Sequence, residues 1–270
     1  MNYSRKGEFY GETNKTIHLD GITLTDTEYT KPKVDWHYHE NAYFTFILQG
    51  NVIKGNKKEI YNCSPGSLLF HNWQEPHYNI KPHGFTRGFH LEIEPLWFAD
   101  LLLNITNLQG SINISHPNIK LLMYKIFRET KMNDTVTGLS VQVLLIEVLS
   151  QLNQIHQTKT IKKPNWVARI DEILHDQFAD ALTLDYLSAM ANVHPVHISR
   201  DFPRYFHCNL GEYIRKIRIE RALALMSQQK IPFTEIAYQC GFFDQSHFIR
   251  CFKEINGINP SVHRKIFLRQ

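Results

Sequence analysis

Residues 231–260 read IPFTEIAYQCGFFDQSHFIRCFKEINGINP, and this stretch decides the fold of the C-terminal part of the chain. Pro232 suits the first turn of a helix, because the N–H that proline lacks has no partner there. Gly241 supplies a tight turn, and a second helix follows from Asp244 to about Asn256. The stretch therefore predicts two short helices joined by a tight turn.

The second of these helices has one apolar face and one polar face. Its expected inward residues recur at helical spacing: Phe248, Cys251, Phe252 and Ile255. Its expected outward residues are mostly polar or basic: Gln245, Ser246, His247, Ile249, Arg250 and Lys253. Such a helix packs by one side and offers the other side to a partner.

A pair of helices with the same arrangement lies earlier in the chain. Thr183 is expected to cap the first helix, and the chain then turns through residues 192–194. Pro195 begins the next helix, which runs toward His207. Its inward residues are spaced four apart: Ile198, Phe202 and Phe206. Between the pairs, residues 211–229 predict an amphipathic helix of about 28 Å, close to the roughly 34 Å between successive major grooves of DNA.

Pro203 lies well inside the second helix of the earlier pair. Proline there removes one intrahelical hydrogen bond and clashes with the carbonyl four residues before it. We therefore expect this helix to kink or stop near Phe202, which would re-aim Ser199 and Arg200.

A family resemblance runs through both pairs and the helix between them. The residues that carry it are Gly211-Glu212-Tyr213-Ile214-Arg215, Arg218, Ala222, Ile236-Ala237, Gly241-Phe242, Ser246, Phe248, Arg250, Phe252-Lys253, Gly257 and Pro260. This pattern resembles the signature of AraC/XylS-type regulators over roughly residues 166–267. The resemblance implies two helix-turn-helix units whose recognition helices read base edges. By position, the base-reading residues would be Val196, Ser199, Arg200, Gln245, Ser246 and Arg250. Arginine suits guanine and glutamine suits adenine.

Basic side chains beside these helices are expected to contact DNA phosphates: Arg204, Arg215, Lys216 and Lys253. Arg218 and Arg221 are instead expected to pair with Glu212 and Glu220 on their own helix. Residues 159–270 hold 16 Lys and Arg against 11 Asp and Glu, whereas residues 1–158 hold 14 against 15. The positive charge thus lies where DNA is expected.

The first 93 residues have the pattern of short strands. The segments rich in β-branched and aromatic residues are Thr16–Thr25, Ala42–Leu48, Asn51–Tyr61, Ser67–His71 and Phe85–Ile93. Their spacing predicts a small antiparallel barrel or sandwich, and helices follow over 95–103, 117–131 and 136–157. The expected fold is therefore two-domain α+β. It comprises a sensor and dimerisation domain over 1–157 (barrel about 14–93, helices about 95–157), a linker over 158–164, and an all-α domain over 165–270.

A looser resemblance concerns the barrel. Trp36-His37-Tyr38-His39-Glu40, Gly50, Pro65-Gly66-Ser67 and Pro76-His77 resemble the two half-motifs of a cupin, the sensor domain of many AraC-type regulators. In metal-binding cupins, His37, His39 and His77 would be ligands together with a glutamate. Tyr43 and Phe44 hold that glutamate's positions here, although three histidines and water can still bind zinc or iron(II). We expect hydrogen-bonded histidines, no metal and no other cofactor, in a pocket for a small-molecule effector that also contains Trp36 and Tyr43.

The 136–157 helix carries an apolar stripe at alternating steps of four and three residues: Val141, Leu145, Val148, Leu152 and Ile155. Such a seam suits a homodimer contact. The same stripe could pack on the barrel, and the sequence leaves both alternatives open.

Composition is that of a folded protein, with 43% hydrophobic and 21% charged residues. No run approaches the roughly 18 apolar residues of a membrane span, and the N-terminus lacks a signal peptide's apolar region, so we expect a cytoplasmic protein. The four cysteines are far apart, which indicates reduced thiols and neither a disulfide framework nor a zinc site.

These features predict a dimeric, effector-responsive transcription regulator without enzymatic activity. Its partners would be double-stranded DNA, a small molecule and, if it is an activator, RNA polymerase. One alternative is a cupin-type metalloenzyme fused to a DNA-binding domain, but the acidic ligand is missing. Another is a DNA-repair methyl acceptor, which needs a metal-held reactive thiolate, and Cys63 has no cysteine neighbours.

Overall fold

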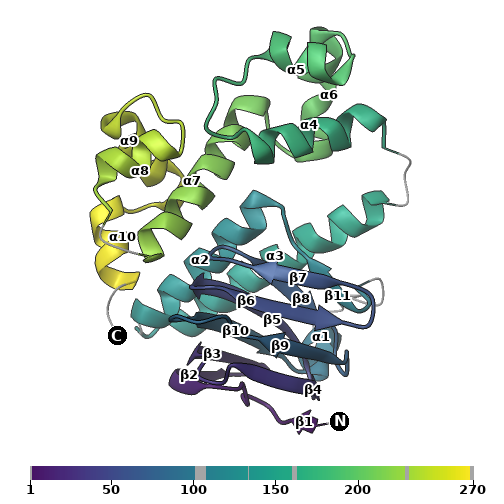
Figure 1. Cartoon of the computed structure of the whole chain (residues 1–270), viewed down its shortest axis with the longest axis vertical. Coiled ribbons are helices and arrows are strands. Elements are labelled where there is room, and N and C mark those ends of the chain that lie inside the picture. Colours follow the sequence, from purple (N-terminus) through teal and green to yellow (C-terminus); the bar gives the residue numbers. More distant parts are fainter. Residues whose placement is uncertain (1, 101–107, 133, 160–162, 229–230, 268–270) are drawn as a thin grey trace. The chain divides into compact units, whose positions relative to one another are not determined.

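The computed structural model describes residues 2–100, 108–132, 134–159, 163–228 and 231–267. It has the predicted α+β organisation, with a β-rich N-terminal part and a helical C-terminal part (Figure 1). The chain divides into two compact units, Met1–Asn153 with Ile266–Gln270, and Gln154–Lys265.

Two facing sheets form the N-terminal unit. One sheet has the order β1 (Asn2–Ser4), β4 (Lys33–His39), β9 (His77–Ile80), β6 (Val52–Asn56) and β7 (Ile60–Cys63). The other has the order β11 (Ser111–Asn113), β8 (Leu68–His71), β5 (Ala42–Gln49), β10 (Arg87–Ile93), β3 (Ile22–Glu28) and β2 (Glu12–Leu19). Among the described strand pairs, β1 with β4 is parallel and the others are antiparallel. The space between the sheets is called the lumen below.

Three of the five predicted strands are confirmed, and two are wrong in extent. The segment 16–25 contains a hairpin turn at Asp20-Gly21, where Gly21 has φ +68°, so it belongs to two strands. The segment 51–61 likewise divides into β6 and β7 around Lys57-Lys58. The prediction also missed β4 and β9, because their many histidines, charges and amides hide the strand pattern.

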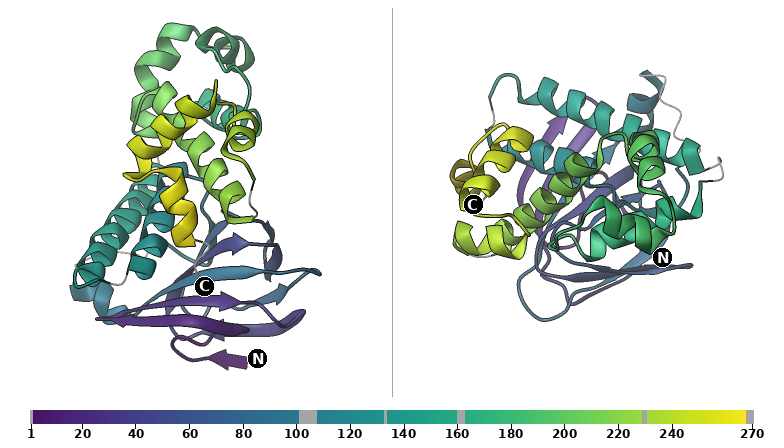
Figure 2. Two further views of the ribbon diagram at one scale, coloured as in Figure 1. Left: turned by 90° about the vertical axis from the view of Figure 1, so that its left-hand side faces the viewer. Right: turned by 90° about the horizontal axis from the view of Figure 1, so that it is seen from above.

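The helices of this unit are α1 (Pro95–Asp100), α2 (Pro117–Met132) and α3 (Thr137–Lys159). Residues 101–103 of the first predicted helix lie outside the described residues, as do 160–162 of the predicted linker. α2 packs on the six-stranded sheet through Phe46 with Tyr124 and Phe89 with Phe127, at ring-centroid distances of 4.7 and 5.1 Å. This sheet therefore buries an apolar face under α2, and its other face borders the lumen (Figures 1 and 2).

The predicted seam on α3 is part of the core. Val141, Leu145, Val148 and Leu152 are each at most 2% exposed. The packing alternative is therefore the correct one for these four residues. A different stripe of α3 faces outward, and it consists of Leu139, Val143 and Ile146; these residues and Val136 in the turn before the helix are 37–66% exposed.

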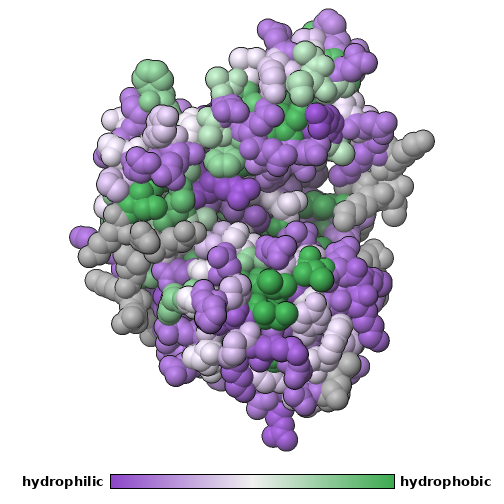
Figure 3. All heavy atoms as spheres, in the orientation of Figure 1, coloured by the Kyte–Doolittle hydropathy of each residue, from purple (hydrophilic) through white to green (hydrophobic). Residues whose placement is uncertain are grey.

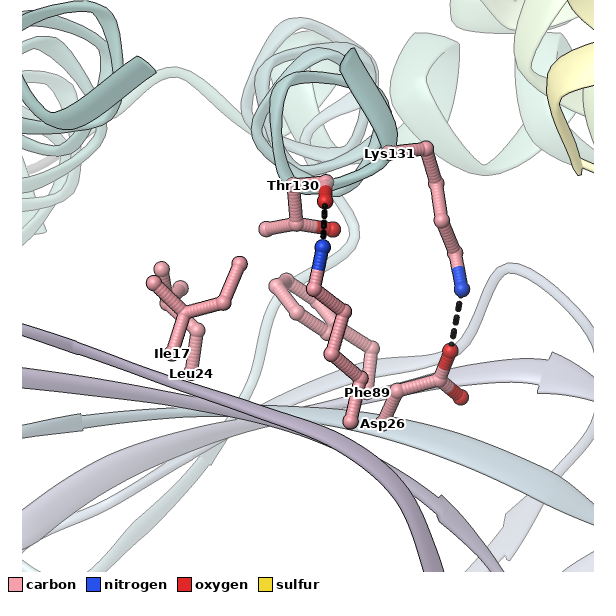
Figure 4. A pocket seen from close by; sticks show the side chains of 7 residues that line it. Ile17, Leu24, Asp26, Phe89, Thr130 and Lys131 are labelled. Atoms are coloured by element: carbon pink, nitrogen blue, oxygen red, sulfur yellow. Dashed lines mark hydrogen bonds and ion pairs between the residues drawn. The ribbon is translucent and has the colours of Figure 1, made fainter. Parts of the chain in front are cut away.

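A buried ion cluster also links the six-stranded sheet to α2. Arg87 donates two hydrogen bonds of 2.7 and 2.6 Å to the carboxylate of Asp26. Lys131 of α2 lies 2.7 Å from the same carboxylate, and Figure 4 shows these two side chains pointing toward each other. Two cations on one buried acid lower its pKa, although burial itself acts to raise it.

The C-terminal unit contains seven described helices. They are α4 (Asn165–Asp176), α5 (Leu184–Ala191), α6 (Pro195–Phe206), α7 (Leu210–Gln228), α8 (Phe233–Gln239), α9 (Gln245–Asn256) and α10 (Pro260–Phe267). The expected caps are confirmed, because Thr183 accepts a hydrogen bond from Tyr186 N and Asp244 accepts one from His247 N. The inward residues of α6 and α9 are buried as predicted, except Ile255, which is partly exposed.

Pro203 does not end α6 near Phe202, so that part of the prediction is wrong. The helix continues to Phe206, where the N–H of His207 bonds to the carbonyl of Pro203. Phe202 and Phe206 stack with ring centroids 4.0 Å apart in the core beside Tyr213. Burial of these rings offsets the hydrogen bond that proline removes.

Candidate functional site

The second helix-turn-helix unit consists of α8 and α9. Ser246 and Arg250 are exposed on α9, and Gln245 at its first turn is partly exposed. Gly241, at φ +72°, makes the turn between the two helices. The three base-reading residues inferred from the resemblance therefore lie on accessible parts of one helix.

The first unit consists of α5 and α6, and its three inferred base-reading residues are also exposed. They are Val196, Ser199 and Arg200. Arg200 donates hydrogen bonds of 2.9 and 3.0 Å to the two carboxylate oxygens of Asp201, and its Nη2 lies 3.2 Å from Nδ1 of His197. The guanidinium is thus held by its own helix. Figure 3 shows hydrophilic and hydrophobic atoms side by side on the surface of the protein.

The four residues inferred to contact phosphates differ in exposure and in ion pairing. Arg204 and Lys253 are exposed, and Arg215 is partly exposed. Lys216 forms an ion pair with Glu212 at 2.8 Å, so DNA would have to compete for it.

Arg218 and Arg221 have structural roles, as expected, although only one has its expected partner. Arg221 lies 3.7 Å from Glu220. Arg218 instead donates to the carbonyls of Phe178 and Asp180, at 2.8 Å each, so its predicted ion pair is wrong. These two hydrogen bonds connect the loop after α4 to α7.

The lumen of the N-terminal unit is polar, in contrast to the apolar face under α2. β4 and β9 contribute His37, His39 and His77, and Tyr43 of β5 bonds to His77 Nε2 at 2.9 Å. Trp36, on the same strand as the first two, is 39% exposed and packs against Tyr78 on the outside. Four of the five predicted pocket residues therefore meet in the lumen, and Trp36 does not. Glu40 is exposed, as its one-residue offset from His39 predicted.

His37, His39 and His77 place one nitrogen each within 4.8 Å of the other two. The Nδ1 atoms of His37 and His77 bond to the carbonyls of Asp35 and Glu75, at 2.8 and 2.9 Å. These bonds orient the rings, as second-sphere bonds do in metal sites.

The charge around this group does not suit a divalent cation. Among the described residues, the group contains no carboxylate. Glu92, a buried carboxylate of β10, accepts hydrogen bonds from Gly7 N and Asn41. A buried ammonium, Lys54, acts on all three histidines. The three nitrogens match the histidine set of some zinc sites in number, but a buried ammonium nearby and the absence of an acidic ligand in the group disfavour a second cation.

Three further polar residues in the lumen were not anticipated: Lys54, His71 and His90. Lys54 Nζ donates to Oγ1 of Thr45 at 3.1 Å, which links the two sheets. His90 lies 3.3 Å from Thr45 Oγ1 and 3.0 Å from the hydroxyl of Tyr29. Alternation along β6, β8 and β10 could have indicated these residues, but only with the strand pairing known.

The five lumen histidines are neutral near pH 7. Burial lowers the pKa of His37 to about 4, and it lowers the pKa values of His39, His71, His77 and His90 well below the usual range. Burial also lowers the pKa of Lys54 to about 8, so its ammonium is still largely protonated at pH 7. Among the described residues that line the lumen, Lys54 is thus a cation surrounded mostly by neutral rings and hydroxyls, and the carboxylate of Glu92 is held by Gly7 N and Asn41.

Phe9 covers part of this polar group. Its ring stacks on His90 with centroids 3.7 Å apart and on His39 at 4.9 Å. Its side chain is only partly buried. Phe9 thus separates these two histidines from the surroundings of the barrel.

Two family models match the chain. One, described as a helix-turn-helix domain, matches residues 187–266, and the other, described as an AraC-like ligand binding domain, matches residues 21–152. The transcriptional regulator GbdR of Pseudomonas aeruginosa is 32% identical over 93 residues, covering 34% of this chain and 25% of GbdR. The chain therefore spans about a quarter of that relative's length.

Other similarities extend over most of the chain. The regulator YbfI of Bacillus subtilis is 25% identical over 247 residues, covering 87% of this chain and 88% of YbfI. A crystal structure of an apo ToxT variant from Vibrio cholerae covers 92% of this chain and 98% of its own, with 14% identity and a TM-score of 0.43. In the part of the chain that the structure describes, no helix is long and apolar enough to span a membrane.

Proposed function

The chain belongs to the AraC/XylS family of transcriptional regulators, and we propose that it binds specific DNA sites and regulates transcription in response to a small molecule. The main support for this proposal is that two helix-turn-helix motifs lie within the C-terminal compact unit. In each of them a recognition helix presents an exposed arginine beside smaller polar residues. An arginine of this kind can donate two hydrogen bonds to one guanine in the major groove.

The first experiment selects DNA sites from a random pool of duplexes with the full chain. We expect one enriched motif with two short elements about one helical turn apart, because a single chain carries two recognition helices. Recovery of unrelated sequences, with equal affinity for random DNA, would contradict sequence-specific binding.

The effector is proposed to bind in the lumen of the N-terminal unit. Support comes from its polar lining and from buried atoms without hydrogen-bond partners, among them Nε2 of His37 and Nδ1 of His39. Such atoms are costly to bury and favour a ligand that satisfies them. An effector that binds two conformations of the chain unequally would shift the chain between them.

A homodimer is proposed through the outward stripe of α3. Leu139, Val143 and Ile146 follow steps of four and three residues, which is the spacing of a two-helix seam, and exposed Val136 immediately precedes the helix. We propose that the stripe packs against the same stripe of a second copy of the chain. A two-fold contact joins identical patches, and an apolar patch can pair with its own copy. RNA polymerase would be a further partner of an activator.

The proposed function includes no enzymatic step. A cupin metalloenzyme would need a metal, and its usual acidic ligand is missing from the group of His37, His39 and His77. A methyl acceptor would need a reactive thiolate, but burial raises the pKa of the Cys63 thiol to about 11. Metal analysis of the purified chain tests the first of these alternatives, because a stoichiometric, tightly held transition metal would support it.

A further inference from the structure

Lys54 is a buried ammonium without an acidic partner. It is 3% exposed, and no carboxylate of the described residues lies within 4.0 Å of it. Its hydrogen bond goes to a neutral hydroxyl, Oγ1 of Thr45. A buried charge without a counter-ion is costly, and proteins normally pair it or neutralise it.

Several side chains of the lumen can donate hydrogen bonds, and its buried carboxylate, Glu92, is not within 4.0 Å of Lys54. Lys54 Nζ lies 3.1 Å from Oγ1 of Thr45 and 5.9 Å from the centroid of the Tyr43 ring, and its charge lowers the pKa values of the five lumen histidines. Nε2 of His71 and the hydroxyls of Thr25 and Thr27 are buried without a partner. These three residues are at most 1% exposed. Hydroxyls and the unpartnered nitrogen of His71 can offer a proton to an acceptor, whereas the ring protons of His37 and His77 are already donated to backbone carbonyls.

These observations describe a place for one negative charge. We propose that Lys54 anchors the carboxylate of a small monoanionic effector inside the lumen, an inference that rests on the effector-dependent function proposed above. A carboxylate offers two oxygens with about four acceptor positions, enough for the ammonium and for neighbouring donors. A single ammonium neutralises one charge, so a monoanion fits better than a dianion such as inorganic phosphate.

The carboxylate would enter the lumen on the side of Phe9. The Phe9 ring stacks on His90, His90 lies 3.3 Å from Thr45, and Thr45 accepts the hydrogen bond from Lys54. Movement of this partly exposed ring would uncover His90, from which polar contacts lead through Thr45 to the ammonium. The lining of that path is mostly imidazole and hydroxyl, which favours a short polar acid over a long alkyl chain.

The test measures thermal unfolding of the full chain with matched acids and amides at constant ionic strength. The probes are acetate, lactate and benzoate, their amides, and inorganic phosphate. We expect at least one carboxylate at 10 mM to raise Tm by about 2–4 °C, the effect of a ligand several-fold above its dissociation constant. The matching amide and phosphate should have no comparable effect.

Lys54→Met should abolish the response, because methionine has a similar length and no charge. Lys57→Met is the matched control, since Lys57 is an exposed residue of the same hairpin and its loss should leave the response intact. If Lys54→Met does not fold, ¹³Cε NMR of the lysines in the unmodified chain replaces it. Addition of the stabilising acid should then move the signal that titrates near pH 8.

The proposal is overturned if no carboxylate raises Tm, if acid and amide act alike, or if Lys54→Met responds as strongly as the unmodified chain. Failure of the broader function would appear elsewhere, as the absence of an enriched DNA motif. The two failures are therefore distinguishable, because the thermal measurement contains no DNA.

Discussion

The carbonyl oxygen of Ala179 lies so close to Gly241 that a Cβ atom at residue 241 would be 2.3 Å from it. Ala179 belongs to the loop after α4, and Gly241 is the turn of the second helix-turn-helix unit. The guanidinium of Arg218, on α7, donates hydrogen bonds to the carbonyls of residues 178 and 180 in the same loop. The turn of the second helix-turn-helix unit therefore packs against backbone that lies near the start of the C-terminal compact unit.

Gly241→Ala should strongly destabilise the C-terminal unit. The residue has φ +72°, which costs about 1–3 kcal/mol for a side chain, and the new Cβ would also meet backbone that cannot move aside. Gly257→Ala is the matched control, because Gly257 has φ +76° and nothing within 4 Å of its Cβ position. Urea unfolding of the full chain measures both variants. Equal losses of unfolding free energy would show that the close approach of Ala179 has no effect.

Local signals in the sequence were sufficient to predict most of the C-terminal unit. Caps at Thr183 and Asp244, prolines at helix starts and the positive-φ glycine all act within a few residues. Pro203 is the exception, since its local cost is outweighed by the burial of Phe202 and Phe206, which depends on residues far along the chain.

Arg250→Ala should weaken binding to the selected DNA site by about 1–3 kcal/mol and relax the preference at one base pair. Lys253→Ala should weaken binding to all sequences alike and reduce the slope of log affinity against log salt by about one unit. Titrations of specific and random duplexes at several salt concentrations distinguish the two effects. If Arg250→Ala kept both affinity and sequence preference, α9 would not be the base-reading helix.

Asp201→Asn should release Arg200 from its two-bond ion pair on α6. The loss of a negative charge near phosphates should strengthen binding to random DNA, while the unrestrained guanidinium should discriminate less well at its base pair. We expect an affinity ratio between specific and random DNA that falls several-fold. The same substitution in an Arg200→Ala background should change this ratio little, because the two residues act as a pair.

Val143→Glu should shift the chain toward monomers by placing a charge in the centre of the outward α3 stripe, where Val143 is 56% exposed. Gln142→Glu adds the same charge at the edge of the stripe, three residues after Leu139 and four before Ile146, and should weaken assembly less. Analytical ultracentrifugation of both variants measures the effect. A dimer of unchanged stability in Val143→Glu would place the contact elsewhere on the chain.

The polar lumen was only partly predictable, and the reason is strand pairing. His37, His39 and His77 were recognised because they belong to short motifs. The position of Lys54 in the lumen cannot be predicted without knowing that β6 and β5 lie in facing sheets. That arrangement brings the Lys54 ammonium to Thr45. The outward α3 stripe was likewise missed, because two stripes of similar spacing occupy one helix and only packing reveals which one is buried.

Lys54 should also make stability depend on pH in the alkaline range. Burial lowers its pKa from 10.5 to about 8. Between these values the unfolded chain binds more protons than the folded chain, so the free energy of unfolding rises with pH across that window. Below pH 8 both states are protonated, and the full cost of burying the charge, about 3 kcal/mol, is present.

The difference in unfolding free energy between the unmodified chain and Lys54→Met should therefore shift by about that amount in favour of the unmodified chain from pH 8 to 10.5. Groups common to both proteins cancel in this difference, and a constant value across the window would mean that Lys54 does not lose its proton early in the folded chain.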